Sequence, residues 1–467
     1  MSDTQDEHVL ASTPLDGWLE CLALEREAER EECNAIADTL PQRELERRGI
    51  AIHRLKIEST ETVLFGRAQL TLQLSGGRPL PPTKITTGTM IALRPANAAA
   101  ATATVGTVTA LRPTSMSVSF EELPEEADLA EPLTVSLMYN DVTYRRIEAA
   151  VGTLRNDAKI PAASAALCRA LLTEDANVAA TAMAAAAAVG QASEPLPAER
   201  AINRGLNDGQ RRAIGFALAA SPVALIHGPP GTGKTTAVVE LIRQAVARGE
   251  RVLASAASNI AVDNMAERLL AGGTSHTGKP LRIVRVGHPA RLLPSVLEAS
   301  LDARMATSDG AAIVRDVRTD LDGARSKLRG ERAKGGRAAL KAEISTLRKE
   351  LTQRQRKAVH DLLSSAQVVL CTNTGAADRA LSCLPEKFAF DLVVIDEAAQ
   401  ALEASCWIAL LRGKRAVLAG DHLQLPPVVK SELAAKRGFG VTLFERLLRT
   451  PADAPSHPHR PVLSTPV

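Results

Sequence analysis

A short glycine-rich segment, HGPPGTGKTT at His227–Thr236, fixes more of the architecture than any other part of the sequence. It follows an apolar run, Val223–Ile226, and precedes an amphipathic stretch that ends near Gly249. The pattern G-x-x-x-x-G-K-[ST] between a strand and a helix turns backbone N–H groups inward, and the helix adds partial positive charge at its amino end. The segment therefore predicts a phosphate-binding loop.

Each residue of this loop has a predicted task. Lys234 is expected to reach the β- and γ-phosphates of a nucleotide, and the Thr235 hydroxyl to ligate Mg²⁺. The other residues predicted to line the phosphates are Gly228, Pro229, Pro230, Gly231, Thr232, Gly233 and Thr236. The alternative, a chance Gly/Pro turn before a helix, is disfavoured because the match is complete and the strand–loop–helix context is right.

A second motif, FDLVVIDEAAQ at Phe390–Gln400, supplies acidic residues after an apolar strand. Asp396 is predicted to hold Mg²⁺ through water, and Glu397 to orient and deprotonate the attacking water. A solvated strand end is the alternative for an isolated Asp-Glu pair. The phosphate-binding loop in the same chain favours the catalytic interpretation.

A third motif, LAGDHLQLPP at Leu418–Pro427, follows another apolar strand. Gln424 is predicted to contact the γ-phosphate and so to report whether that phosphate is present. Taken alone, the pattern is equally typical of a plain turn after a strand. Its position after the phosphate-binding loop and the Asp396-Glu397 motif in the same chain favours the sensor role.

The second half of the chain predicts a doubly wound α/β domain, with its ligand at the carboxyl ends of parallel strands. The apolar runs suited to such strands are Val223–Ile226, Arg251–Ser255, Val368–Thr372, Leu392–Ile395 and Arg415–Ala419. Between about Leu301 and Leu363 the sequence is strongly charged and helical in pattern. This stretch predicts an insertion of one or two helices that stands off the core.

The first half of the chain predicts a small β-barrel carried on helices, because short alternating stretches are separated by glycines. Pro41 is expected to end or kink the first helix, and the acidic and basic residues of 25–31 are expected to be solvated. The predicted units are a disordered N-terminus 1–14, a stalk helix 15–49, a barrel 50–138 with a loop insertion at Ala96–Ala103, a returning stalk helix 139–175, an Ala-rich linker 176–200, an α/β domain 201–449 and a Pro-rich tail 450–467.

Composition narrows the function classes. The formal net charge of +3 argues against a polybasic binder, and 2% aromatic residues argue against a base-stacking platform as the main device. The six cysteines form no CxxC pair, and His457 and His459 in the tail predict a solvated segment rather than a metal site. A polar N-terminus and the lack of a long apolar run predict an intracellular protein with no membrane span.

The motifs together resemble a known family. GPPGTGKTT, SNIAVDN at Ser258–Asn264, DEAAQA and GDHLQLPP look like motifs I, Ia, II and III of superfamily 1B helicases, and most of all like the immunoglobulin μ-binding protein type among the Upf-like enzymes. The resemblance extends from about Leu15 to Leu448. It includes NDVTYRR at Asn140–Arg146 and RVGHPARLL at Arg285–Leu293.

The resemblance implies roles for residues outside the three motifs. Gln210 matches an adenine-reading glutamine, for which a helix-surface residue is the alternative. Ser258, Asn259 and Asn264 match positions that face the nucleic acid, for which helix capping is the alternative at Ser258 and Asn259. It also implies a RecA-like fold for the α/β domain, a stalk-borne barrel before it and a helical insertion that helps to clamp the strand.

The implied activity is that of an ATP-dependent 5′-to-3′ helicase. It would use ATP and Mg²⁺, act on single-stranded RNA or DNA and work as a monomer in the cytoplasm or nucleus, with ribosome- or tRNA-associated complexes as further partners. A non-enzymatic, ATP-gated nucleic-acid-binding module is the second hypothesis. A GTPase is disfavoured because the chain has no NKxD motif.

One departure from the family concerns the end of the chain. The family places a second RecA-like domain after GDxxQLPP, whereas this sequence runs from LFERLL at Leu443–Leu448 into a Pro-rich tail. Because the arginines of such a domain raise hydrolysis rates by about 10³–10⁵, we expect this chain alone to bind nucleotide, hydrolyse it very slowly and unwind nothing.

Overall fold

The structure, a computed structural model, describes residues 14–39, 41–63, 67–96, 103–120, 129, 131–138, 141–172, 194–272, 280–308, 310–330 and 334–448. Residues 1–13 of the predicted N-terminus 1–14, most of the Ala-rich patch at Ala96–Ala103, most of the linker 176–200 and the tail 450–467 lie outside these residues. The predicted solvation of His457 and His459 is therefore not described.

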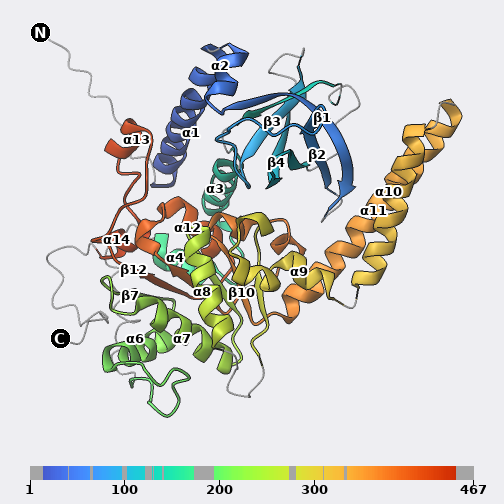
Figure 1. The fold of residues 1–467 in the computed structure, drawn as a ribbon. Helices are drawn as coiled ribbons and strands as arrows, with labels where there is room; N and C mark the ends of the chain where they lie inside the picture. Colours follow the sequence, from blue (N-terminus) through green and yellow to red (C-terminus); the bar gives the residue numbers. More distant parts are fainter. Residues whose placement is uncertain are drawn as a thin grey trace, which may run out of the picture.

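Six antiparallel strands close into a barrel in the order β1-β2-β5-β4-β3-β6 (Figure 1). The strands are β1 Ala51–Thr62, β2 Ala68–Leu74, β3 Met90–Pro95, β4 Thr104–Leu111, β5 Ser115–Phe120 and β6 Leu133–Leu137. Alternate residues such as Leu70, Leu72 and Val118 point inward and are fully buried. Closure removes the exposed strand edges and confirms the barrel that the alternating sequence predicted.

Helices lead into and out of the barrel. They are α1 Pro14–Thr39, α2 Gln42–Arg47, α3 Asp141–Leu154 and α4 Ala165–Leu172. Pro41 separates α1 from α2, as a residue without a backbone N–H and with a fixed φ does. Arg26 on α1 lies 2.6 Å from Asp141 on α3, so the two helices are tied to each other.

One expectation about α1 is wrong. Glu25 is not solvated but 4% exposed, because its carboxylate accepts the backbone N–H groups of Lys430 at 2.7 Å and Ser431 at 2.8 Å. These residues lie just before α13 (Glu432–Lys436), at the far end of the described chain. A local charge pattern does not reveal such a partner, because the partner is supplied by the tertiary fold.

A six-stranded parallel sheet forms the second half, in the order β7-β12-β11-β8-β10-β9. Its strands are β7 Val223–His227, β8 Val252–Ala256, β9 Ile283–Arg285, β10 Val368–Thr372, β11 Leu392–Asp396 and β12 Ala416–Gly420. The order confirms the predicted α/β class with a RecA-like parallel sheet. The three-residue β9 was not predicted, because so short a run has no periodicity of its own.

The two faces of the sheet have different covers. Val393 and Ile395 belong to a core shared with α1, α3, α4 and α12 (Glu403–Leu410), whereas Leu392 and Val394 face a core shared with three other helices. Those helices are α6 Asp208–Ala219, α7 Lys234–Ala247 and α8 Asn259–Ala271. The stalk therefore packs on one face of the sheet and also carries the barrel.

The charged insertion forms a long helical hairpin that projects from the sheet domain (Figure 1). Its helices are α10 Ala311–Gly330 and α11 Lys334–Ser365, preceded by the short α9 Leu301–Ala306. Leu321 and Leu351 are fully buried between the two long helices, whereas most other side chains of the hairpin are at least partly exposed. Within the described residues, no helix is long and apolar enough to cross a membrane.

Candidate nucleotide and nucleic-acid site

Strands β7, β12 and β11 are neighbours in the sheet, so the loops at their carboxyl ends lie at one edge. These loops carry the phosphate-binding motif, the Gln424 motif and the Asp396-Glu397 pair. The backbone N–H of Gly228 donates to the Gly420 carbonyl at 3.2 Å, which ties the first two loops together. Topology thus brings together residues that are almost 200 positions apart, at the edge where α/β folds bind ligands.

The phosphate-binding loop is shaped by two glycines. Gly231 has φ +80° and Gly233 φ +77°, a backbone region that a residue with a Cβ rarely adopts. A Cβ on Gly233 would also lie 2.5 Å from the Gln210 side chain. Gly233 is the residue before α7, so the turn delivers the loop to the amino end of a helix of 14 residues.

Lys234 and Glu397 form an ion pair across the site. The Lys234 Nζ lies 2.9 Å from the Glu397 carboxylate, and both side chains are largely buried. Glu397 has φ +52°, one of two positive-φ residues other than glycine in the described chain. A non-glycine residue in this region costs about 1–3 kcal/mol and persists where the surroundings enforce it. The pair places an ammonium and a carboxylate where phosphate and water would meet.

Asp396 ends β11 and is 2% exposed. Burial raises the pKa of this carboxyl to about 6, against the lowering effects of the Lys234 charge and of hydrogen bonds from the Glu397 N–H and the Thr235 hydroxyl. A carboxylate beside a hydroxyl is the hard oxygen set that Mg²⁺ takes, and a dication there would offset the charge that burial penalises. The residues therefore fit the predicted ion.

Gln210 is not a helix-surface residue but lies 7% exposed against the phosphate-binding loop. Its Nε2 donates to the Thr232 carbonyl at 2.9 Å, and its Oε1 accepts the Asn207 N–H at the start of α6. A carboxamide has two donor hydrogens and two acceptor lone pairs. One donor hydrogen and one acceptor lone pair therefore remain for hydrogen bonds to a base, which is compatible with the predicted reading of adenine.

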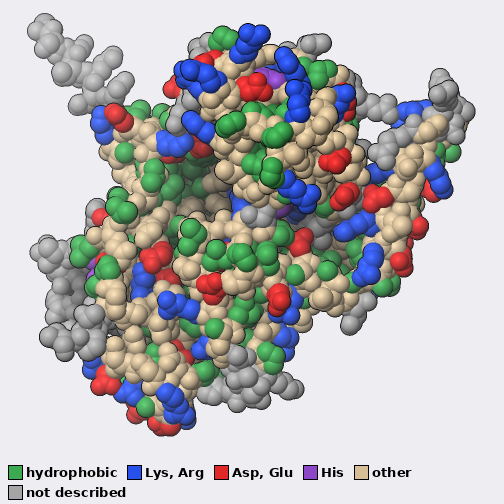
Figure 2. All heavy atoms as spheres, in the orientation of Figure 1, with side chains coloured by type: hydrophobic (Ala, Val, Ile, Leu, Met, Phe, Trp, Pro, Cys, Tyr) green, Lys and Arg blue, Asp and Glu red, His purple; other side chains and the backbone are tan. Residues whose placement is uncertain are grey.

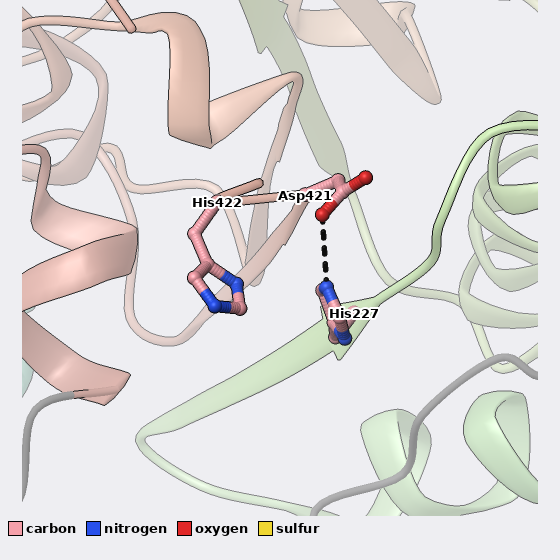
Figure 3. Close-up of side chains that lie close together, drawn as sticks. All are labelled: His227, Asp421 and His422. Carbon is pink, nitrogen blue, oxygen red and sulfur yellow. Dashed lines mark hydrogen bonds and ion pairs between the residues drawn. The ribbon is translucent and has the colours of Figure 1, made fainter. Parts of the chain in front are cut away.

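Asp421 joins the Gln424 motif to β7, a connection that the sequence did not predict (Figure 3). Its carboxylate accepts from the His227 Nε2 at 3.0 Å, from the Leu423 N–H at 3.1 Å and from the Gln424 Nε2 at 3.1 Å. These hydrogen bonds hold its pKa below the usual range despite burial. The Gln424 carboxamide is therefore held by the residue that also contacts the start of the phosphate-binding loop.

His227, Asp421 and His422 are also the group in the described residues that could hold a transition metal, with ligand atoms within 4.8 Å of one another (Figure 3). Two imidazoles and a carboxylate are ligands that zinc accepts. Asp421 already accepts three hydrogen bonds, and the His422 ring is exposed. The hydrogen-bonded arrangement explains the cluster without an ion.

The predicted nucleic-acid residues lie at the start of α8. Ser258 is the N-cap, since its hydroxyl accepts the Ala261 N–H, and the side-chain Oδ1 of Asn259 accepts from the Arg285 guanidinium at 2.9 Å. Ser258 therefore has the capping role named as its alternative, Asn259 is the first residue of α8 and is held by Arg285 instead of capping, and Asn264 is exposed. Ile260 is 66% exposed between them, an apolar side chain that sequence reasoning missed. Their roles in binding a strand stay predictions.

Basic residues tie the barrel and stalk to the sheet domain. Arg146 on α3 donates to the Thr374 carbonyl at 3.1 Å, after β10, and Arg291 donates to the Gly88 carbonyl of the barrel. Figure 2 shows a hollow between the barrel and the sheet domain, with Lys and Arg side chains along the barrel beside it. The hollow lies on a face where a phosphate backbone would find positive charge.

The fold and the site together define a P-loop NTPase. Residues 205–432 match a family described as an AAA domain, and residues 17–139 match the 1B domain of helicase SMUBP-2/HCS1. The second match covers α1, the barrel and the segment up to α3. In both of these regions the chain is similar to the SMUBP-2/HCS1 helicases.

Curated relatives agree with this placement. The chain is 42% identical over 439 residues to the DNA-binding protein SMUBP-2 of Mus musculus, which covers 92% of this chain and 42% of that protein. It is 43% identical over 252 residues to the DNA polymerase alpha-associated DNA helicase A of Schizosaccharomyces pombe, covering 54% of this chain and 36% of the relative. A regulator of nonsense transcripts 1 homolog of Arabidopsis thaliana is 35% identical over 245 residues, covering 52% and 18%. The chain thus spans less than half the length of these relatives.

Proposed function

We propose that the chain binds Mg²⁺–ATP at the carboxyl edge of its parallel sheet and couples nucleotide hydrolysis to single-stranded nucleic acid, as the motor of a 5′-to-3′ helicase. The observation that carries the proposal is the convergence of Lys234, Asp396 and Glu397 beside the glycine-shaped loop. Without the adjacent glycine-shaped loop, the contact between Lys234 and Glu397 would indicate only an ion pair.

Each side chain has a distinct task in this proposal. Lys234 leaves Glu397 and neutralises the β- and γ-phosphates, while Asp396 and the Thr235 hydroxyl hold the ion that offsets charge on the phosphates. Glu397, once released, accepts the proton of the attacking water at its carboxylate. Gln424, held by Asp421, contacts the γ-phosphate, and the remaining amide groups of Gln210 select adenine.

The nucleic acid is proposed to bind along the start of α8 and in the hollow beneath the barrel. Asn264 and Ile260 are exposed there, next to the loops of the nucleotide site. By family resemblance, the proposal extends to RNA or DNA strands in ribosome- or tRNA-associated complexes, in the nucleus or cytoplasm, with the protein acting as a monomer. Gel filtration and subcellular fractionation check the last two points.

A titration with a fluorescent ATP analogue tests the nucleotide site. Replacing Lys234 with Ala removes the ammonium that faces the phosphates, so we expect the affinity to fall at least about tenfold. Lys414→Ala is the matched control, because its ion pair with Asp391 is exposed and lies at the other end of β11. Equal affinities for the wild type and Lys234→Ala would refute the proposal. A duplex-unwinding assay on the same chain tests the expectation that it unwinds nothing alone, whereas ATP turnover that rises on adding single-stranded nucleic acid separates a motor from an ATP-gated binding module.

A further inference from the structure

An arginine of α8 contacts the helix that follows the phosphate-binding loop. The guanidinium of Arg268 donates to the Thr236 hydroxyl at 3.0 Å. Thr236 lies in the first turn of α7, two residues after Lys234, and Arg268 is exposed. None of the sequence motifs pointed to Arg268, because the contact depends on α7 and α8 packing against each other in the fold.

The hydroxyls of Thr235 and Thr236 serve different sides of the site. The Thr235 hydroxyl bonds Asp396, where the magnesium ion is proposed. Successive residues of a helix point about 100° apart, so Thr236 points in another direction. A Cβ on Gly233 would lie 2.5 Å from the Gln210 Nε2 and 3.9 Å from the Thr236 Cβ. Thr236 therefore lies on the side of the loop where adenine is proposed to bind, which is the side of the phosphate next to the ribose.

The contact with Arg268 decides how the Thr236 hydroxyl is turned. A threonine in a helix has two common rotamers, and in one of them the hydroxyl bonds a carbonyl three or four residues earlier. Here the hydroxyl accepts from Arg268 instead. Since a hydroxyl has one hydrogen and two acceptor lone pairs, accepting from Arg268 leaves the Thr236 hydrogen for a second partner. Beside a phosphate-binding loop, the partner that this hydrogen fits is a charged phosphate oxygen.

The backbone of Arg268 is also fixed to α7. Arg243 of α7 is 8% exposed, and its guanidinium donates to the Arg268 carbonyl at 2.8 Å. Gly272, the C-cap of α8, makes room for this contact, because a Cβ there would collide with the Arg243 guanidinium. The two helices thus hold each other at two points, and Arg268 takes part in both. Its side chain reaches Thr236 from a fixed position.

We propose that Arg268 is a positioning residue of the nucleotide site, which holds the Thr236 hydroxyl so that its hydrogen points to the phosphate next to the ribose. This inference rests on the proposed function, because it needs a nucleotide on the phosphate-binding loop. Arg268 acts through Thr236 and does not itself touch the phosphate. ATP and ADP share the α-phosphate, so the pair contributes equally to the binding of both and little to the hydrolytic step.

The test titrates the 467-residue chain with fluorescent analogues of ATP and of ADP. In Arg268→Ala we expect the affinity for both analogues to fall by the same factor of about five, as the loss of one hydrogen bond allows. The KM for ATP should rise by that factor, while phosphate release at saturating ATP changes less than about twofold. A merely structural role of Arg268 would not separate KM from kcat in this way.

A double-mutant cycle shows whether Arg268 acts through Thr236. Thr236→Val removes the hydroxyl and keeps a branched side chain, and Arg268→Ala in that background should lose no further affinity. Thr236→Ser keeps the hydroxyl, so it should stay sensitive to Arg268→Ala. Arg437→Ala is the control, because this exposed arginine pairs with Glu20 of α1 and should match the wild type. Since Arg268 is exposed, Arg268→Ala should also melt close to the wild type.

Three results would overturn the inference and leave the proposed function intact. Losses that add in the double variant would make Arg268 a direct phosphate contact. A loss of affinity for the ATP analogue alone would place the pair at the γ-phosphate. Unchanged affinities in Arg268→Ala would make the contact one between helices only. If the wild type binds neither analogue, the proposed function itself is wrong.

Discussion

At the scale of single residues, the side chains of the proposed nucleotide site are paired with one another. The Lys234 ammonium pairs with the Glu397 carboxylate at 2.9 Å, and the Asp421 carboxylate accepts a hydrogen bond from the Gln424 carboxamide. Both contacts involve the groups that the proposed function assigns to phosphate and water. A bound triphosphate therefore has to separate the first pair before Glu397 can accept a proton.

Glu397→Gln is predicted to bind ATP more tightly and hydrolyse it more slowly. The change keeps the side-chain size but removes a negative charge beside the γ-phosphate, which is worth about 1 kcal/mol or more at short range. A carboxamide cannot accept the proton of water, so we expect phosphate release to fall by at least about 10²-fold. Nucleotide titration and a phosphate-release assay measure the two effects.

Glu386→Gln is the control for charge alone, because Glu386 is exposed before β11. It should match the wild type in both assays. Wild-type turnover by Glu397→Gln would remove Glu397 from its assigned role and leave the binding site intact.

Several of these residues could be predicted from sequence because their motifs are local. Lys234 and Thr235 follow the glycine loop directly, and Asp396 ends an apolar strand, so strand–loop–helix patterning was enough to find them. The contacts of Asp421 with His227 could not be found this way. They depend on β7 and β12 being neighbours in the sheet, an order that periodicity does not reveal.

At the scale of elements, the stalk does two things at once. Helix α1 packs on the face of the sheet, where Trp18 lies 6.5 Å from Trp407 of α12, and it also leads to the barrel. Its sequence showed only a thin apolar stripe between charged residues. The sequence predicted that α1 is a helix but not where it packs, because its partners come from α3, α12 and α13.

Glu25→Ala is predicted to destabilise the fold by about 2–3 kcal/mol. The change leaves the backbone N–H groups of Lys430 and Ser431 without their charged acceptor, and a hydrogen bond to a buried charged group is worth about 1.5–3 kcal/mol. Urea unfolding followed by tryptophan fluorescence measures it. Glu31→Ala, at an exposed position of α1, should change little, and equal losses in both variants would contradict the argument.

At the scale of the whole molecule, the barrel is joined to the sheet domain through a partly buried basic junction. His288 lies there, and burial together with the charges of Arg67 and Arg291 lowers its pKa to about 4. The imidazole thus stays neutral in the folded protein at pH values where an unfolded histidine takes up a proton. The junction therefore contains an imidazole, that of His288, which stays neutral down to a lower pH than an exposed histidine does.

The stability contributed by a neutral His288 is predicted to fall as the pH is lowered from about 6.5 toward 4. Over this range the unfolded chain binds more protons than the folded chain, so the free energy of unfolding decreases. At pH 5 the loss is about 2 kcal/mol, from 1.36 kcal/mol per pKa unit. Asp396, whose pKa is raised to about 6, acts in the opposite direction.

The measurement is therefore a difference between the wild type and His288→Asn. Urea unfolding at pH 7 and pH 5 should show the wild type losing about 2 kcal/mol relative to the variant, because the Asp396 contribution cancels. His360→Asn, on α11 with a partly exposed ring, is the control. A difference that does not change with pH would mean that His288 is not shielded from protons as described.

The contact of Glu25 with Lys430 and Ser431 has a consequence for how the chain is made. These residues are 405 and 406 positions apart, so the first helix emerges during translation long before the segment that satisfies its buried carboxylate. The barrel, whose strands all lie within 51–137, can close early. The stalk can complete its packing only after synthesis has passed Ser431, so docking of the stalk on the sheet domain follows closure of the barrel.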